Sequence, residues 1–189
     1  MAKIGLDYVA VAKLAAGATS AATATYTDGK YMGTSAGLTG NVTSNDVKDY
    51  GDDRTVETDT SFQSGSLSWE KNDIEDEDYA YLLGHTYDST EKTVLANADD
   101  IAPYVGVGVV GKSKRSGSYV YVAKIYLKVQ FHEPNDENAT KQDTVAFAHE
   151  TIEGNVFELP NGDWKEQKSF ETLAAAQAFV DTKLGITTP

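Results

Sequence analysis

Two apolar runs separated by a short polar stretch dominate the pattern of the chain between residues 103 and 131. In the second run, every odd-numbered position from Tyr119 to Phe131 is apolar or aromatic, whereas the even positions include Lys124 and Lys128. An alternation of period two is typical of a β-strand, and it predicts that the odd-numbered residues from Tyr119 to Phe131 lie on one face of that strand. We therefore predict a long β-hairpin over 104–131, with its turn between Lys112 and Ser118.

Similar alternation predicts further strands over 4–14, 36–47 and 61–70, and two more between 144 and 159. In the strand over 61–70, Ser64, Ser66 and Ser68 occupy one face, and Leu67 and Trp69 occupy the other. This pattern predicts a strand with small residues on one face and with Trp69 in the core.

Two helices complete the predicted fold. The first spans 73–84, because acidic residues fill its first turn and Gly84 is placed to end it. The second spans 169–185, where apolar residues recur at helical spacing and Gly185 follows. The chain is thus predicted to be α+β and mainly β, with antiparallel strands, a short central helix and a C-terminal helix.

Charge is distributed unevenly along the chain. Residues 46–59 carry six acidic residues against Lys48 and Arg54, and such a run favours a solvated acidic loop. The predicted hairpin turn instead contains Lys112, Lys114 and Arg115, in a chain whose formal net charge is -13. A basic hairpin tip on an acidic body is the first indication of function.

Length and composition limit the classes of protein to which this chain can belong. A length of 189 residues suits a single domain, here 1–189, with a core of its own. The strong negative charge argues against wrapping nucleic acid, because phosphates are bound by clustered Lys and Arg. The absence of cysteine excludes disulfides and thiolate metal sites. No membrane span or signal peptide is recognisable, so we expect the protein to stay in the cytosol until something else releases it.

Catalytic chemistry is not indicated by any motif. The histidines are His85, His132 and His149, and none has a partner at the spacing of metal ligands. Gly106 and Gly108 resemble part of a dinucleotide fingerprint, but they lie in a hairpin arm with no helix after them. We therefore expect no enzymatic activity, no metal and no cofactor.

Several stretches taken together resemble the major tail proteins of long-tailed bacteriophages, which are the subunits of the tail tube. The resemblance covers nearly the whole chain and rests on MAKIGLDYVAVAKL, DVKDYGDDRTVETDTSFQSGSLSWE, DIEDEDYAYLLG, YVGVGVVGKSKRSGSYVYVAKIYLKVQF and SFETLAAAQAFVDTKLG. It implies an antiparallel β-sandwich or partly rolled barrel with a flanking helix. It also implies a virion protein, made in the host cytoplasm, that assembles into stacked hexameric rings.

The same resemblance implies the partners. The chain would bind copies of itself, a tape-measure protein, and tail initiator and terminator proteins, while DNA passes through the tube without specific binding and no membrane is involved. An acidic inner wall would repel phosphates and let the genome slide.

We hypothesise that the basic tip and the acidic segment meet across stacked rings; the alternative is that they are two unrelated solvated loops. The residues of this predicted stacking interface are Lys112, Lys114, Arg115, Asp46, Asp49, Asp52, Asp53, Glu57 and Asp59.

Two other classes stay open. A secreted or surface β-sandwich binding module would use tyrosine as a contact residue, and the chain contains eleven. A hydrolase would need a pocket with convergent polar groups.

Overall fold

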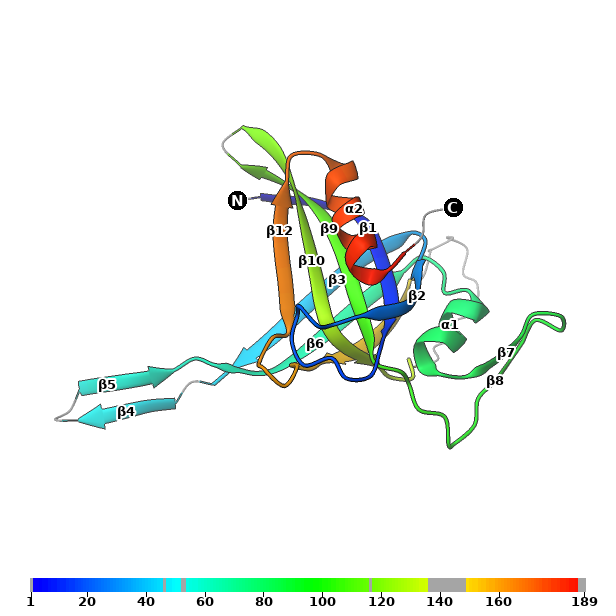
Figure 1. The fold of residues 1–189 in the computed structure, drawn as a ribbon, viewed down its shortest axis with the longest axis horizontal. Helices are drawn as coiled ribbons and strands as arrows, with labels where there is room; N and C mark the ends of the chain where they lie inside the picture. The colour runs from blue at the N-terminus through cyan, green and yellow to red at the C-terminus, as the bar shows by residue number, and fades with distance from the viewer. Residues whose placement is uncertain (1, 46, 52–53, 116, 136–148, 187–189) are drawn as a thin grey trace, which may run out of the picture.

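The computed structural model describes residues 2–45, 47–51, 54–115, 117–135 and 149–186, and its strands and helices are shown in Figure 1. In chain order these elements are β1 (Ala2–Leu14), β2 (Tyr26–Tyr31), β3 (Ser35–Ser44), β4 (Val47–Gly51), β5 (Arg54–Asp59), β6 (Phe62–Lys71), α1 (Asp76–Leu83), β7 (Thr86–Asp88), β8 (Thr93–Leu95), β9 (Val105–Arg115), β10 (Ser118–Phe131), β11 (Glu150–Val156), β12 (Lys165–Phe170) and α2 (Leu173–Leu184).

The predicted hairpin is confirmed and lies at the centre of an eight-stranded antiparallel sheet. The strand order is β2-β1-β9-β10-β11-β6-β3, and β12 pairs with β10 beside this path. The early part of β10 pairs with β12 and its last residues pair with β11. Because β10 changes partner along its length, the sheet divides there into two halves.

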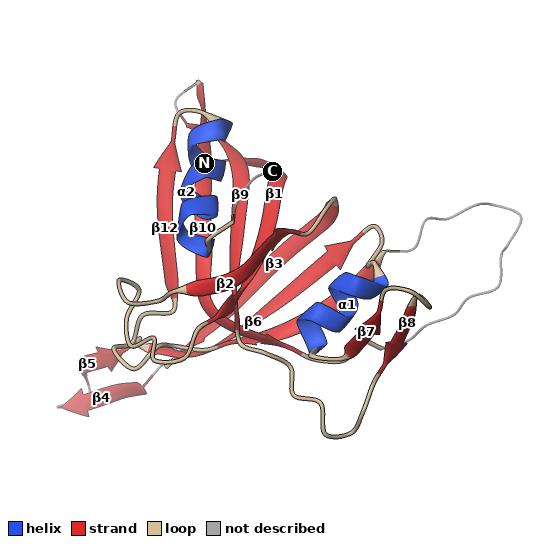
Figure 2. Ribbon diagram, turned by 45° about the vertical axis from the view of Figure 1, so that its right-hand side comes forward, coloured by secondary structure: helices blue, strands red, loops and turns tan. Residues whose placement is uncertain are grey.

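The two halves and α2 form layers. Figure 1 shows α2 in front of β9 and β10, with β3 and β6 behind, and Figure 2 shows β3 and β6 running obliquely to the central strands. One core, which includes Trp69 and Phe131, lies between the halves of the sheet. A second core, which includes Ile125, Val180 and Leu184, lies beneath α2. The fold is therefore α+β and mainly β, with a sandwich-like sheet and a flanking helix, as predicted.

Glycines in β9 explain how closely α2 packs on the sheet. A Cβ atom at Gly108 would collide with the Val180 side chain, and one at Gly106 would collide with Tyr26. The glycines that resembled a phosphate-binding fingerprint therefore leave room for the side chains that cover this face of the sheet.

One β-bulge alters the predicted faces of β10. The register with β9 shifts between Tyr126 and Val129. As a result, Ile125 and Leu127 pack under α2, whereas Val129 and Phe131 pack into the other core. The prediction that all odd-numbered residues from Tyr119 to Phe131 lie on one face of the strand was therefore wrong. Odd positions are apolar on both sides of the bulge because both faces of this strand are covered, so the alternation in sequence continues through it.

The predicted turn of the hairpin was too long. Pairing between β9 and β10 continues to Arg115 and Ser118. The basic residues Lys112, Lys114 and Arg115 are consequently the last residues of a strand, in a regular register with Tyr121, Tyr119 and Ser118.

The acidic segment is also more regular than predicted. Residues expected to form a loop over 46–59 instead form the two strands β4 and β5, which pair with each other as a separate sheet. Figure 1 shows these strands projecting from the body of the molecule. The run of charges concealed the strand pattern, because alternation of apolar residues is the signal on which strand prediction depends.

Both helices end as predicted, at Gly84 and Gly185, each of which has a left-handed backbone conformation. Their starts differ from the prediction. Helix α1 is preceded by Glu75, and α2 begins only after Thr172, whose side chain accepts a hydrogen bond from the Ala175 N–H. Ser169 and Phe170, which were expected to begin this helix, are the last residues of β12 and pair with β10.

Candidate functional site

Strand β3 forms an edge of the sheet and carries no charged residue. It pairs with β6 on one side, and the described residues provide no strand on its other side. Its ten residues, SAGLTGNVTS, include neither proline nor any Asp, Glu, Lys or Arg, and most are exposed. Edge strands of monomeric proteins usually carry such residues to prevent pairing with other chains. Strand β3 lacks this protection.

The outer face of β3, β6 and β11 consists of small polar side chains, and we call it the hydroxyl face. The register aligns Thr39, Ser68 and Glu153 in one row, and Asn41, Ser66 and Asn155 in the next. The hydroxyl face is completed by Thr43, Ser64, Glu70 and Thr151. Two of these ten residues are acidic and none is Lys or Arg, so phosphate groups find no cation on it.

The three basic residues at the tip of the β9–β10 hairpin have no anionic partner among the described residues. The ammonium group of Lys112 lies 4.2 Å from the centre of the Tyr119 ring, which is itself 53% exposed. The Nε atom of Arg115 is buried and has no hydrogen-bond partner in the described part of the chain. No carboxylate among the described residues therefore neutralises these three charges.

The acidic partners proposed for these residues lie elsewhere in the molecule. Asp46, Asp52 and Asp53 fall outside the described residues. The backbone register places Asp49 opposite Glu57, and Val47 opposite Asp59. Figure 1 shows the β4–β5 hairpin and the tip of the β9–β10 hairpin at different ends of the molecule. The structure thus does not bring the two charged groups together within one copy.

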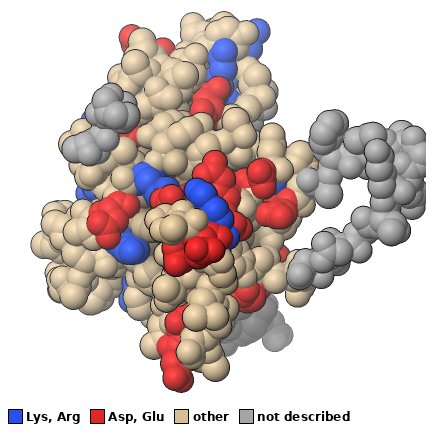
Figure 3. All heavy atoms as spheres, turned by 90° about the vertical axis from the view of Figure 1, so that its right-hand side faces the viewer, with Lys and Arg blue, Asp and Glu red and all other residues tan. Residues whose placement is uncertain are grey.

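Charged residues also join α1 to the sheet. Asp78 is buried and lies 2.9 Å from the Lys71 ammonium and 2.7 Å from that of Lys30. Burial by itself raises the pKa of Asp78, but hydrogen bonds from Lys30 and Lys71 outweigh this effect and lower it below its usual value. Figure 3 shows this side of the molecule, where acidic side chains surround a few lysines. The contacts attach α1 to β2 and β6.

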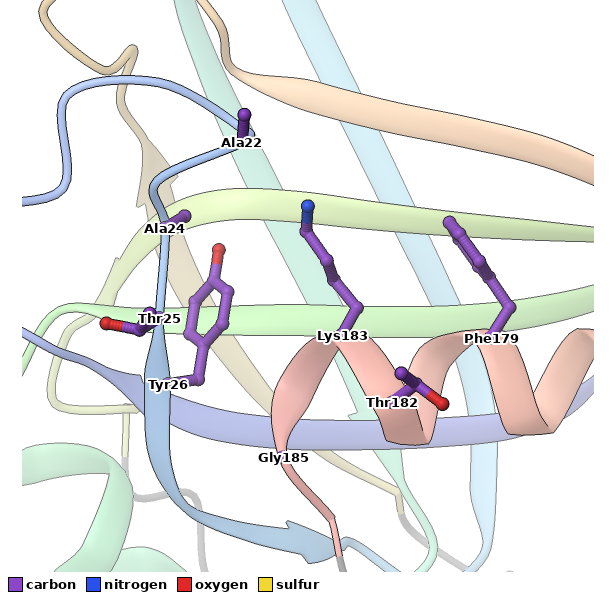
Figure 4. A pocket seen from close by; sticks show the side chains of 8 residues that line it. All are labelled: Ala22, Ala24, Thr25, Tyr26, Phe179, Thr182, Lys183 and Gly185. Atoms are coloured by element: carbon purple, nitrogen blue, oxygen red, sulfur yellow. The ribbon is translucent and has the colours of Figure 1, made fainter.

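A shallow hollow of about 390 Å³ lies between α2 and the start of β2. Figure 4 shows Phe179 and Lys183 projecting from α2 on one side of it and Tyr26 on the other. The Lys183 ammonium donates a hydrogen bond to the Ala21 carbonyl and lies 3.0 Å from Glu166, and the Tyr26 hydroxyl donates to the Leu127 carbonyl. Burial raises the pKa of Tyr26 above its usual value. The polar groups in this hollow thus bind neighbouring segments of the chain.

Comparison with other proteins does not assign the chain to a family. No model of a known protein family matches the sequence, and no curated protein matches it either.

The described residues contain no group of three or more acidic residues or histidines arranged to hold a metal ion. They also contain no helix long and apolar enough to cross a membrane.

Part of the hydroxyl face corresponds to a pattern that is visible in the sequence. Ser64, Ser66 and Ser68 alternate with Leu67 and Trp69, and this alternation predicted small residues on one face of β6. The extension of this face across β3 and β11 was not predictable, because residues 39, 68 and 153 are aligned only by long-range strand pairing.

Proposed function

We propose that this chain is the structural subunit of a bacteriophage tail tube. Six copies form a homo-hexameric ring, and the rings stack to form a conduit for DNA. The observation that carries the proposal is the unprotected edge of β3. An edge of ten residues without charge or proline presents backbone N–H and C=O groups to a second strand. In a ring, this edge is paired by a neighbouring copy.

The sheet has other edges to complete such a contact. Among the described residues, β2 pairs only with β1, and β12 pairs only with β10. Contact between two different edges is heterologous, and heterologous contacts close into rings when the rotation between copies permits it. The open sheet supports head-to-tail association of this kind.

The hydroxyl face is the proposed lining of the conduit. A lining must contact hydrated DNA without retaining it, and retention comes from Lys and Arg that displace counterions from phosphates. This face supplies hydroxyl and amide groups together with Glu70 and Glu153. Its carboxylates repel phosphate, and its small side chains leave the surface without deep pockets.

The projecting hairpin of β4 and β5, which we call the acidic arm, supports the proposed stacking of rings. A two-stranded hairpin by itself is marginally stable in water. An arm of this type gains stability by packing on another molecule, and its acidic residues suit the unpaired cations at Lys112, Lys114 and Arg115 of a copy in the next ring. The tape-measure, initiator and terminator proteins remain proposed partners on the basis of the family resemblance.

The edge contact is tested by Val42→Lys, which places a charge on β3 where the side chain is 44% exposed. Negative-stain microscopy of concentrated wild-type protein is expected to show rings or tubes. The variant is expected to stay monomeric with an unchanged circular dichroism spectrum. Thr90→Lys, an exposed position on the β7–β8 turn, is the matched control and should assemble. Assembly of Val42→Lys would exclude β3 as the contact.

Stacking is tested separately by replacing Lys112, Lys114 and Arg115 together with glutamate. If the tip joins successive rings, this variant should form no tubes although the monomer folds. Tubes of normal length would exclude the contact between tip and arm.

A binding module is the second candidate, supported by the exposure of Tyr31, Tyr104 and Tyr119. Wild-type protein that stays monomeric at high concentration would favour it over the tail tube.

A further inference from the structure

His85 lies directly after α1 and connects three segments of the chain. Its side chain is only 8% exposed, and its Nδ1 atom lies 2.8 Å from an oxygen of Asp100. Its Nε2 atom lies 3.2 Å from an oxygen of Glu133. The Tyr79 hydroxyl donates a hydrogen bond to the other oxygen of Glu133.

Each of these partners belongs to a different segment. Asp100 lies in the loop before β9, where its carboxylate also accepts a hydrogen bond from the Asn97 N–H. Glu133 follows the end of β10, and Tyr79 lies within α1. Asp100, Glu133 and Tyr79 are the titratable groups that the described segments place against the imidazole, and the two carboxylates favour a positive charge on it. The hydrogen bond with Asp100 raises the pKa of His85 above its usual value, and Glu133 adds to this effect.

The two contacts respond differently to loss of the proton. A protonated imidazole donates at both nitrogens, whereas a neutral one donates at one and carries a lone pair at the other. The shorter contact, to Asp100, keeps the remaining N–H. The lone pair on Nε2 then faces the Glu133 carboxylate, whose side chain is 57% exposed and which, among the described residues, is then held only by the Tyr79 hydroxyl.

We propose that His85 is a protonation-controlled clamp: when protonated it joins Glu133, just after β10, to Asp100 in the loop before β9, and when neutral it keeps Asp100 and leaves Glu133 to the Tyr79 hydroxyl. The clamp does not depend on the proposed tail-tube function.

The test is an NMR titration of the full chain that follows the His85 ring and the Tyr79 ring. His85 is expected to titrate with a midpoint above about 6.5, the ordinary value for histidine, and the Tyr79 signals should shift with the same midpoint. A His85 midpoint at or below the ordinary value would overturn the proposal. Tyr79 signals that do not change while His85 titrates would also overturn it.

Two variants separate the contacts. Glu133→Gln should lower the proton affinity of His85 by roughly two- to fivefold, the range for a half-exposed ion pair. Its amide can donate to the neutral Nε2, so the response of Tyr79 should disappear. Asp100→Asn should lower the proton affinity by about tenfold or more, because it removes a charge-assisted hydrogen bond. The control His132→Gln should leave both signals unchanged. An unchanged midpoint in Glu133→Gln would show that Glu133 takes no part.

Discussion

Strands of the same sheet differ in how many of their faces are covered. Strands β1, β9 and β10 lie between α2 and the other half of the sheet, and β9 is buried at six successive positions. Strands β6 and β11 bury one face and expose the other as part of the hydroxyl face, and β3 at the edge is exposed over most of its length. The central strands therefore supply most of the apolar burial that stabilises the fold, and the outer strands present a surface that can change without affecting the core.

The largest expected effect comes from the buried face of an outer strand. Trp69 is fully buried and its indole N–H donates to the Ser35 hydroxyl. Trp69→Ala should lower the free energy of unfolding by about 3–5 kcal/mol through loss of burial and formation of a cavity. Ser66→Ala, on the exposed face of the same strand, should change it by less than about 0.5 kcal/mol. Urea unfolding measures both, and equal effects would remove the distinction between the two faces.

Removing a charge between the outer strands and α1 should have the next largest effect. Asp78→Asn leaves the buried Lys71 ammonium without its anionic partner, which should cost about 3 kcal/mol at neutral pH. Because the pKa of Asp78 is lowered in the folded protein, its contribution is present above its ordinary pKa near 4 and is lost as pH falls through the folded pKa.

Urea unfolding of wild type and Asp78→Asn across the acid range checks this prediction. The difference in stability between them should shrink as the pH falls. A difference that is constant between neutral and strongly acidic pH would contradict the role of the ion pair.

A smaller effect should follow from filling space in the central strands. Gly108→Ala places a methyl group against Val180 and should lower stability by about 1–3 kcal/mol through overpacking under α2. Gly5→Ala is the matched control in β1, because no atom outside its chain neighbours lies within 4 Å of the added Cβ. Thermal unfolding of both variants tests whether the loss of stability comes from the contact with α2 or from the replacement of a glycine in a strand. Equal losses in Gly108→Ala and Gly5→Ala would contradict the contact with α2 as the cause.

The smallest expected effect concerns the helix that covers the central strands. Thr172→Ala removes the side-chain oxygen that accepts the Ala175 N–H and should cost about 1 kcal/mol. Thr172→Ser keeps the acceptor and should retain most of the stability. A serine variant as unstable as the alanine variant would show that capping is not the cause.

The sequence predicted the central hairpin, the two helix ends and the row of small residues on one face of β6, because each depends on local signals. Alternation identifies a strand, and glycine marks a helix end. The bulge near Tyr126 was not predictable, since both faces of β10 are apolar around it. The same limit applies to the clamp. His85 is 15 residues from Asp100 and 48 residues from Glu133, and no local pattern in the sequence indicates that the three side chains meet.

The basic tip illustrates an intermediate case. Its three cations were evident from the sequence, but their position on the last paired residues of β9 depends on how far the register with β10 extends. The acidic arm was recognised by charge and mistaken for a loop, because strand pairing there is not accompanied by an apolar face.

Cryo-electron microscopy of the assembled wild-type protein tests the central claim most directly. We expect rings of identical copies around an axial channel, with β3 of each copy at the contact with its neighbour and the hydroxyl face lining the channel. Assemblies without a channel, or a channel lined by the lysines of β10 and β12, would contradict it.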